Sequence, residues 1–181
     1  AEAVKKSIQT VQTSCHNHGK TFYARTWAGA NQIDVRDGIL KTNDTTTWMM
    51  NKNVGGNAGY DWQYMDTHLA VIGTVSNNGF NELMEFDLCG EYLGQSHFTF
   101  DMTSYLKDHW NYAYNLGVRG GMVARIDPLG SLANYTANRV HLYALKEILA
   151  NRNADPAAVN LAWCQQYFPA DAAQDIADHY D

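Results

Sequence analysis

The sequence predicts an α/β protein with parallel strands, organised as a single domain over residues 1–181. Two observations predict this class. Short runs rich in aromatic and β-branched residues alternate along the chain with segments of helical periodicity, which is typical of strands joined by helical crossovers. The chain also shows no internal repeat, low-complexity tract or linker, and its 181 residues suffice for one domain with a substantial core.

In the first part of the chain, the residue pattern predicts one helix and two strands. Apolar residues recur at helical spacing over residues 1–18, and Gly19 ends this helix. Aromatic and β-branched residues predict strands over residues 20–27 and 45–52. The segment between these strands, residues 29–44, is polar and contains Asp37-Gly38, so we expect a loop there.

The rest of the chain predicts two more strands and several helices. Residues 68–75 are apolar and fit either a short strand or a helical turn, whereas the alternating stretch that starts at Glu82 predicts the third strand. Further on, the pattern predicts a helix over 102–117, a fourth strand over 120–126, and helices over 138–151, from Asp155-Pro156 onward and over 170–180. Residues 132–181 therefore form a mostly helical C-terminal part that we expect to pack on the strands.

The number of strands predicts part of a (β/α)8 TIM barrel. Long polar loops rich in Gly and Asn follow two of the strands, which is where such barrels keep their catalytic residues. A closed barrel needs eight strands and typically about 250 residues. Four clear strands correspond to about half of one, so we expect a partial barrel followed by C-terminal helices.

Composition and charge exclude several classes of function. The net charge is −6 and no basic cluster is longer than Lys5-Lys6, which excludes nucleic acid as a partner. No apolar run approaches the roughly 20 residues needed to span a bilayer, so we expect no membrane association. Three widely spaced cysteines, Cys15, Cys89 and Cys164, argue against a disulfide framework. The compartment stays open, with the cytoplasm favoured over secretion.

We expect neither a metal nor a cofactor. The run Cys15-His16-Asn17-His18 contains residue types that bind metals, but no second cluster of such residues lies at a defined spacing. The glycine pairs Gly55-Gly56 and Gly120-Gly121 do not match a phosphate-binding loop.

The third strand has one apolar and one polar face. In the stretch ELMEFDLCGEYLGQ, residues 82–95, the period of two places polar side chains on a single face, namely Glu85, Asp87, Cys89 and Glu91. In a barrel this face would point inward, where buried carboxylates need partners. Glu91 would lie at the C-terminal end of the strand, close to a substrate.

Charged residues also lie at or after the ends of the first and second predicted strands. Arg25 ends the first strand, Lys52 ends the second, and Asp61 follows the loop after it. Two cations and two carboxylates at one edge of a sheet suit the hydrolysis of a sugar that bears its own acid group. The cations would bind the sugar's carboxylate, and Asp61 and Glu91 would provide general-base catalysis. Structural roles for these residues remain open alternatives.

The segments that carry these residues resemble the catalytic barrel of the α-glucuronidases of glycoside hydrolase family 67. The resemblance extends over roughly residues 20–168, and its elements keep the family's order. They are Arg25-Thr26-Trp27, Lys52-Asn53, Asp61-Trp62-Gln63, Leu83-Met84-Glu85-Phe86, Glu91-Tyr92-Leu93-Gly94-Gln95, and the helix Ala137-Asn138-Arg139-Val140-His141-Leu142-Tyr143-Ala144 followed by Asp155-Pro156.

This resemblance implies an inverting hydrolase that acts on uronic-acid-bearing polysaccharide or oligosaccharide. It implies that Asp61 and Glu91 activate the attacking water and that Arg25 and Lys52 recognise the uronate carboxylate. Trp62 or Tyr92 could stack on the sugar ring or pack beneath the loops.

The family's general acid comes from a strand upstream of the Arg-Thr element, and residues 1–19 do not supply it. We therefore expect this chain to form the C-terminal half of a barrel and to need a partner. That partner would be the missing N-terminal half or a second copy of the chain, which favours a homo-oligomer.

Two other functions stay open. The chain could be a non-catalytic module or a decayed half-barrel that binds acidic sugars without chemistry. Alternatively, the substrate could be another sugar, with Arg25 and Lys52 bonded to Glu85 or Asp87 instead of to a ligand.

Overall fold

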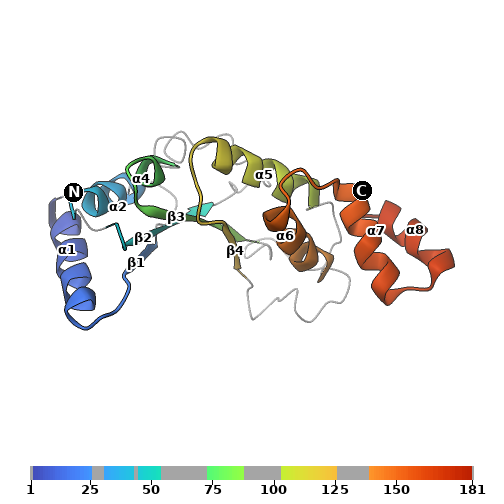
Figure 1. Ribbon diagram of the computed structural model, residues 1–181, viewed down its shortest axis with the longest axis horizontal. Helices are drawn as coiled ribbons and strands as arrows, with labels where there is room; N and C mark the ends of the chain where they lie inside the picture. The colour runs from blue at the N-terminus through green and yellow to red at the C-terminus, as the bar shows by residue number, and fades with distance from the viewer. Residues whose placement is uncertain are drawn as a thin grey trace. The chain divides into compact units, whose positions relative to one another are not determined.

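The computed structural model describes residues 2–25, 31–42, 45–53, 73–87, 103–125 and 139–180, with only the backbone described at 31–32, 51–53, 84–87 and 123–125. The described helices are α1 Glu2–Asn17, α2 Asn31–Leu40, α4 Thr74–Asn77, α5 Thr103–Asn115, α6 Val140–Ala150, α7 Pro156–Tyr167 and α8 Ala170–Asp178 (Figure 1). The described strands are β1 Tyr23–Arg25, β2 Trp48–Asn53, β3 Asn81–Asp87 and β4 Met122–Arg125.

The strands form one sheet in the order β1-β2-β3-β4 (Figure 1). β2 pairs in parallel with β1 on one side and with β3 on the other. Helix α2 lies between β1 and β2 in the chain, and α4 lies between β2 and β3. Parallel neighbours require such crossovers, because the chain must return to the same end of the sheet. The predicted α/β class with parallel pairing is confirmed, and the sheet formed by the described strands is open.

Most predicted elements are present. The helix predicted over residues 1–18 is α1, and the helix predicted over 102–117 is α5, which ends before Gly117 with its φ of 112°. The helix predicted from Asp155-Pro156 is α7, with Pro156 in its first turn. Strand β1 begins at Tyr23, three residues later than predicted, and the last two residues of the predicted strand, Thr26 and Trp27, lie outside the described residues.

The loop predicted over residues 29–44 is wrong for most of its length, because α2 spans Asn31–Leu40. Gly38 suggested a turn but serves helix packing instead. A Cβ at this position would lie 2.8 Å from Ile8 Cδ1 of α1, so a larger residue would require the end of the Ile8 side chain to shift. Ile39 follows Gly38 and is fully buried. Tertiary contact therefore outweighs the local turn preference.

The chain folds into two compact units. Unit 1 comprises Ala1–Phe86 and Ala113–Val123, and unit 2 comprises Asp87–Tyr112 and Ala124–Asp181. The boundaries between the units fall inside β3, inside α5 and inside β4.

The core of unit 1 lies between the sheet and its helices. Its buried residues come from α1, β1, α2, β2 and α4 and are Ile8, Ala24, Ile39, Met49 and Val75. One face of the sheet is therefore covered by helices. The buried amide of Gln12 on α1 donates a hydrogen bond of 2.6 Å to the Thr47 hydroxyl just before β2, which satisfies both polar groups inside this core.

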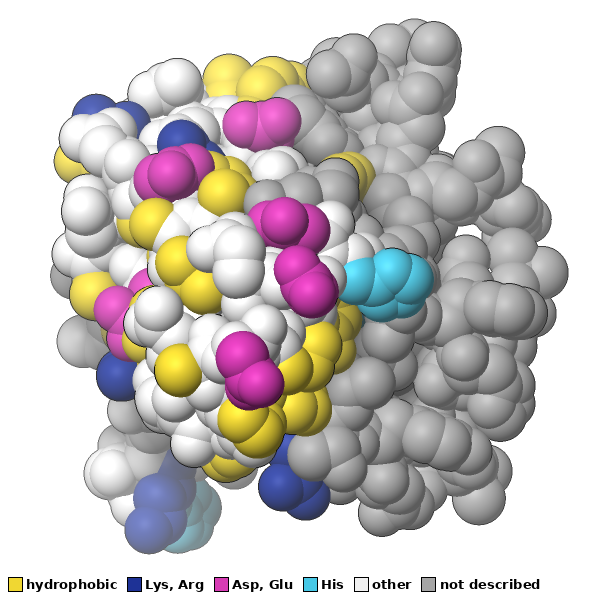
Figure 2. Space-filling model, turned by 90° about the vertical axis from the view of Figure 1, so that its right-hand side faces the viewer, with side chains coloured by type: hydrophobic (Ala, Val, Ile, Leu, Met, Phe, Trp, Pro, Cys, Tyr) yellow, Lys and Arg dark blue, Asp and Glu magenta, His cyan; other side chains and the backbone are white. Residues whose placement is uncertain are grey.

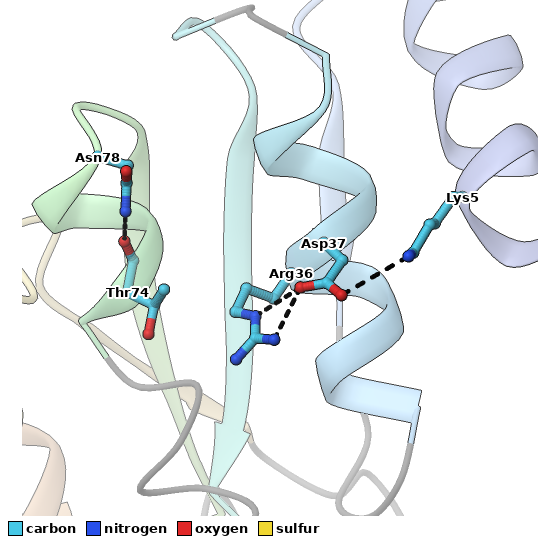
Figure 3. A network of polar contacts seen from close by, with 5 residues as sticks. All are labelled: Lys5, Arg36, Asp37, Thr74 and Asn78. Carbon is cyan, nitrogen blue, oxygen red and sulfur yellow. Dashed lines mark hydrogen bonds and ion pairs between the residues drawn. The ribbon is translucent and has the colours of Figure 1, made fainter. Parts of the chain in front are cut away.

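An ion-pair network joins α1 to α2 at the surface of unit 1 (Figure 3). Asp37 Oδ1 lies 2.7 Å from Arg36 Nη2, and Asp37 Oδ2 lies 3.7 Å from Lys5 Nζ. Partly exposed pairs of this kind typically contribute less than about 1 kcal/mol each. The apolar contacts of Ile8 and Ile39 consequently dominate the packing of α1 on α2.

Glu82 anchors the short helix α4 to β3. Its carboxylate is fully buried and accepts hydrogen bonds from the backbone N–H groups of Gly73, at 2.8 Å, and Ser76, at 3.2 Å. These donors belong to the start of α4, where helical N–H groups have no partner within the helix. The backbone carbonyl of Glu82 also accepts the Gly120 N–H at 2.9 Å. One residue thus connects β3 with α4 and with the segment that precedes β4.

The core of unit 2 is helical and aromatic. A cluster contributed by α6, α7, α8 and the segment just after α8 contains Val140, Trp163, Cys164, Ala173, Ala177 and Tyr180. The Trp163 ring meets Tyr180 edge-on at a centroid distance of 6.0 Å. Thr103 at the start of α5 donates a 2.6 Å hydrogen bond to the buried Asn160 side chain of α7. This bond fixes the start of α5 against α7.

The buried phenol of Tyr180 makes the stability of the protein sensitive to high pH. Burial raises the pKa of Tyr180 from 10.0 to about 12, and the charge of Cys164 adds to the shift. The unfolded state releases this proton near pH 10 and the folded state only near pH 12. The contribution to stability is therefore complete below pH 10 and is lost as the pH rises to about 12.

We expect the free energy of unfolding to fall less steeply between pH 10 and 12 in Tyr180→Phe than in the wild type, as measured by urea denaturation. The control is Tyr167→Phe, because Tyr167 is exposed and should keep the wild-type slope. Equal slopes in the wild type and in Tyr180→Phe would contradict this assignment.

Helix α8 is amphipathic. It buries Ala173 and Ala177 and exposes Asp171, Asp175 and Asp178. The face viewed in Figure 2 carries acidic side chains interspersed with hydrophobic ones.

Within the described ranges, no helix combines the length and the apolar character needed to cross a bilayer.

Candidate functional site

The structure places Arg25 and Lys52 on neighbouring parallel strands near their C-terminal ends. Arg25 is the last residue of β1 and pairs with Met50, and Lys52 lies two residues beyond Met50 on β2. With a rise of about 3.3 Å per residue and about 4.8 Å between strands, the backbones of Arg25 and Lys52 are about 8 Å apart. The backbone positions of the two predicted cations therefore both lie near one end of the sheet.

Residue alternation assigns both cations to the same face. Ala24, Met49 and Glu82 belong to the helix-covered face and are 7%, 0% and 0% exposed. Residues one position away belong to the opposite face. This opposite face, called here the second sheet face, carries Tyr23 and Arg25 of β1, Trp48, Met50 and Lys52 of β2, and Asn81, Leu83, Glu85 and Asp87 of β3.

Lys52 is paired with Glu85 in the register of β2 and β3. Directly paired residues of adjacent strands share a face and lie about 4.8 Å apart at the backbone. A cation of the candidate site thus has an acid as its immediate neighbour across the strands. The second acid of β3, Asp87, is two residues further along the same face.

The other predicted site residues, Asp61, Trp62, Glu91 and Tyr92, lie outside the described residues, as does Cys89. Of the predicted site, the structure accordingly describes Arg25 and the backbone of Lys52. The two carboxylates assigned to catalysis remain predictions from the sequence.

An aromatic pair lies on the second sheet face at the opposite end of the strands. The rings of Tyr23 and Trp48 stack with centroids 5.9 Å apart and an interplanar angle of 23°. Both residues begin their strands and are paired in the register. Tyr23 is 55% exposed. The sequence signal for this placement was strand alternation, because Tyr23 is next to Ala24 and must lie on the opposite face from it.

The histidines near the end of α1 have local partners. His16 Nε2 lies 3.2 Å from the Thr46 hydroxyl, and His18 Nδ1 lies 2.7 Å from the Ser14 carbonyl oxygen. Among the residues described by the structure, no group of three or more His, Cys, Asp or Glu side chains is arranged to hold a metal ion.

In comparisons with known proteins, neither a protein-family model nor a curated protein matches this chain.

Proposed function

We propose that this chain is the C-terminal half of the catalytic barrel of an inverting glycoside hydrolase similar to the family 67 α-glucuronidases. Its substrates are uronic-acid-bearing polysaccharides or oligosaccharides. The observation that carries the proposal is the ordered set of Arg25, Lys52, Asp61 and Glu91, each at or after the end of a predicted strand. The general acid comes from a partner, which is an upstream half-barrel or a second copy of the chain.

The architecture of unit 1 supports this proposal. A parallel sheet brings the C-terminal ends of its strands to one edge, and barrel enzymes assemble their catalytic sites at this edge. Arg25 and Lys52 lie near this edge, on one face of neighbouring strands. When the backbones of an arginine and a lysine are about 8 Å apart, both side chains are long enough to reach a single carboxylate.

The proposed chemistry divides the four residues into two roles. Arg25 and Lys52 bind the sugar's carboxylate, with Arg25 suited to a bidentate contact. Asp61 and Glu91 activate water for attack on the anomeric carbon. In inverting enzymes the acid and base are about 6.5–9.5 Å apart, which leaves room for this water.

Binding of glucuronate tests the cationic part of the site. We expect Arg25→Ala to weaken glucuronate binding at least tenfold in calorimetry, because a charge-assisted contact of about 1.5–3 kcal/mol is lost. Glucose, which lacks the carboxylate, should bind equally to both forms. The control is Arg36→Ala, because Arg36 lies on α2 and is already paired with Asp37.

Equal glucuronate affinity in the wild type and Arg25→Ala would contradict the anion site. Binding that depends on Arg25 without turnover, even with an upstream half-barrel present, would favour the non-catalytic module. Hydrolysis that persists after Asp61→Asn and Glu91→Gln would exclude both carboxylates from catalysis.

A further inference from the structure

We propose that the ring of Tyr23, backed by Trp48, is a stacking platform for a uronic acid residue, and that Arg25 holds the carboxylate of this same residue. The inference rests on the proposed function and deepens it, because it names the surface on which the sugar ring lies.

The ring of Tyr23 has one packed side and one open side. On the packed side it stacks on Trp48, with ring centroids 5.9 Å apart and an interplanar angle of 23°. Tyr23 is nevertheless 55% exposed. Among the described strands, β1 lies at the edge of the sheet, next to β2 alone. The side of the ring that points away from Trp48 is therefore open to a ligand.

Trp48 fixes the position of the Tyr23 ring. The indole of Trp48 lies against the backbone of Gly120, where an added Cβ would be 2.8 Å from Trp48 Cζ3. The Gly120 N–H in turn donates a 2.9 Å hydrogen bond to the backbone carbonyl of Glu82 on β3. Tyr23 is thus the exposed end of a packed layer. A platform whose orientation is set before binding loses little conformational freedom when the ligand arrives.

Arg25 places a cation beside this ring. Tyr23 and Arg25 are both exposed, and because they are two positions apart in β1 they belong to the same face of the sheet. Their backbones are about 7 Å apart along the strand. An arginine side chain can span this separation, so one ligand can contact the Tyr23 ring and the Arg25 guanidinium together.

These two side chains match the chemistry of a hexuronate. The hydroxyls of glucuronate are equatorial, so C–H groups cover the faces of its ring, and these groups are attracted to the negative face of an aromatic ring. The carboxylate projects from the edge of the sugar, where a guanidinium can bind it through two parallel hydrogen bonds. A neutral sugar would use the ring of Tyr23 alone. The combination therefore favours a sugar that carries an acid group.

Replacing Tyr23 tests the platform in the full chain. Titrations followed by NMR saturation transfer measure the affinities for glucuronate and glucose. Tyr23→Ala should weaken the binding of both sugars about three- to tenfold, because the stacking contact is lost. Tyr23→Phe keeps the ring and should rescue this binding, with saturation transfer to the C–H protons of glucuronate. Arg25→Ala should weaken only glucuronate.

Two further variants guard against indirect effects. Tyr23→Leu keeps an apolar side chain against Trp48 but lacks a flat ring, so it should show the same loss even if Tyr23→Ala does not fold. Tyr167→Ala removes an exposed tyrosine of unit 2 and should leave both affinities unchanged. Urea denaturation shows which variants are folded.

The outcomes separate this inference from the proposed function. If Arg25→Ala weakens glucuronate binding and Tyr23→Leu does not, the platform is overturned and the proposed function stands. Equal losses in Tyr23→Phe and Tyr23→Leu overturn stacking, because the hydroxyl would then be the contact. Binding that depends on Tyr23 but not on Arg25 contradicts the anion site of the proposed function and overturns a uronate as the ligand.

A contact between copies of the chain is the competing use of this ring. If Tyr23→Leu forms a smaller oligomer in light scattering while its sugar binding equals that of the wild type, the ring belongs to such a contact and the platform is overturned. A wild type that binds neither sugar overturns both the platform and the proposed function.

Discussion

Replacing Gly73 by alanine should destabilise the protein by about 2–5 kcal/mol. Gly73 precedes α4 with a φ of 78°, a region that costs residues with a Cβ about 1–2 kcal/mol. A Cβ at this position would also overlap the backbone carbonyl oxygen of Leu116, and backbone atoms cannot move aside as a flexible side chain can. Overpacking of this kind typically adds about 1–3 kcal/mol. Urea denaturation measures the loss.

Gly79 provides a matched control for this prediction. Its φ is 84°, close to that of Gly73, but a Cβ there would meet no atom within 4 Å. Gly79→Ala should therefore show the conformational cost alone, about 1–2 kcal/mol. If Gly73→Ala costs no more than Gly79→Ala, the close approach of Gly73 to Leu116 does not exist in solution.

Truncating Glu82 should cost about 3 kcal/mol or more. Glu82→Ala removes a fully buried side chain and leaves the N–H groups of Gly73 and Ser76 without their acceptor. Each buried donor left unsatisfied costs about 1–3 kcal/mol, and the cavity adds to this loss. The free energy of unfolding from urea denaturation gives the magnitude, and hydrogen exchange at Gly73 and Ser76 reports the local effect.

Two variants separate the contributions of Glu82. Glu82→Gln keeps the shape of the side chain, but its amide group would face a backbone donor, so we expect a loss smaller than in Glu82→Ala yet above about 1 kcal/mol. Glu147→Ala removes an acid that is paired with the exposed Lys146 and should cost less than about 1 kcal/mol. A loss in Glu82→Ala as small as that in Glu147→Ala would show that this carboxylate does not hold α4.

The sequence predicted those elements whose local pattern agrees with their environment. Helix α5 repeats apolar residues at three and four positions and buries Leu106, Trp110 and Ala113 on one side. In α7, Pro156 occupies the first turn, where its missing N–H costs nothing. In such cases propensity, periodicity and packing favour the same structure.

The prediction failed where a distant contact decided the structure. Gly38 favours a turn locally, but it lies in a helix that packs at this point against Ile8 of α1, 30 positions earlier in the chain. Glu82 belongs to the helix-covered face of β3 by alternation, yet its polarity gave no indication that α4 would supply its hydrogen-bond donors. Contacts of this kind require the fold and are absent from any local pattern.

For the candidate site, sequence and structure contribute different parts. The positions of Arg25 and Lys52 at strand ends follow from their local residue pattern. The neighbouring positions of Lys52 and Glu85 do not, because strand register depends on how β2 and β3 align. Asp61 and Glu91 lie outside the described residues, so their roles depend on their positions in the predicted strands and on the resemblance.

The spacing of the paired strands has a consequence for folding kinetics. Arg25 pairs with Met50, and Met50 pairs with Leu83. Each pair of strands therefore closes a loop of roughly 25 to 33 residues before its hydrogen bonds can form. The entropy lost in closing these loops slows the folding of the sheet. Helices α6, α7 and α8 instead follow one another closely in the chain and pack on their neighbours. In a refolding experiment, the helical contacts of unit 2 should accordingly form ahead of the parallel sheet.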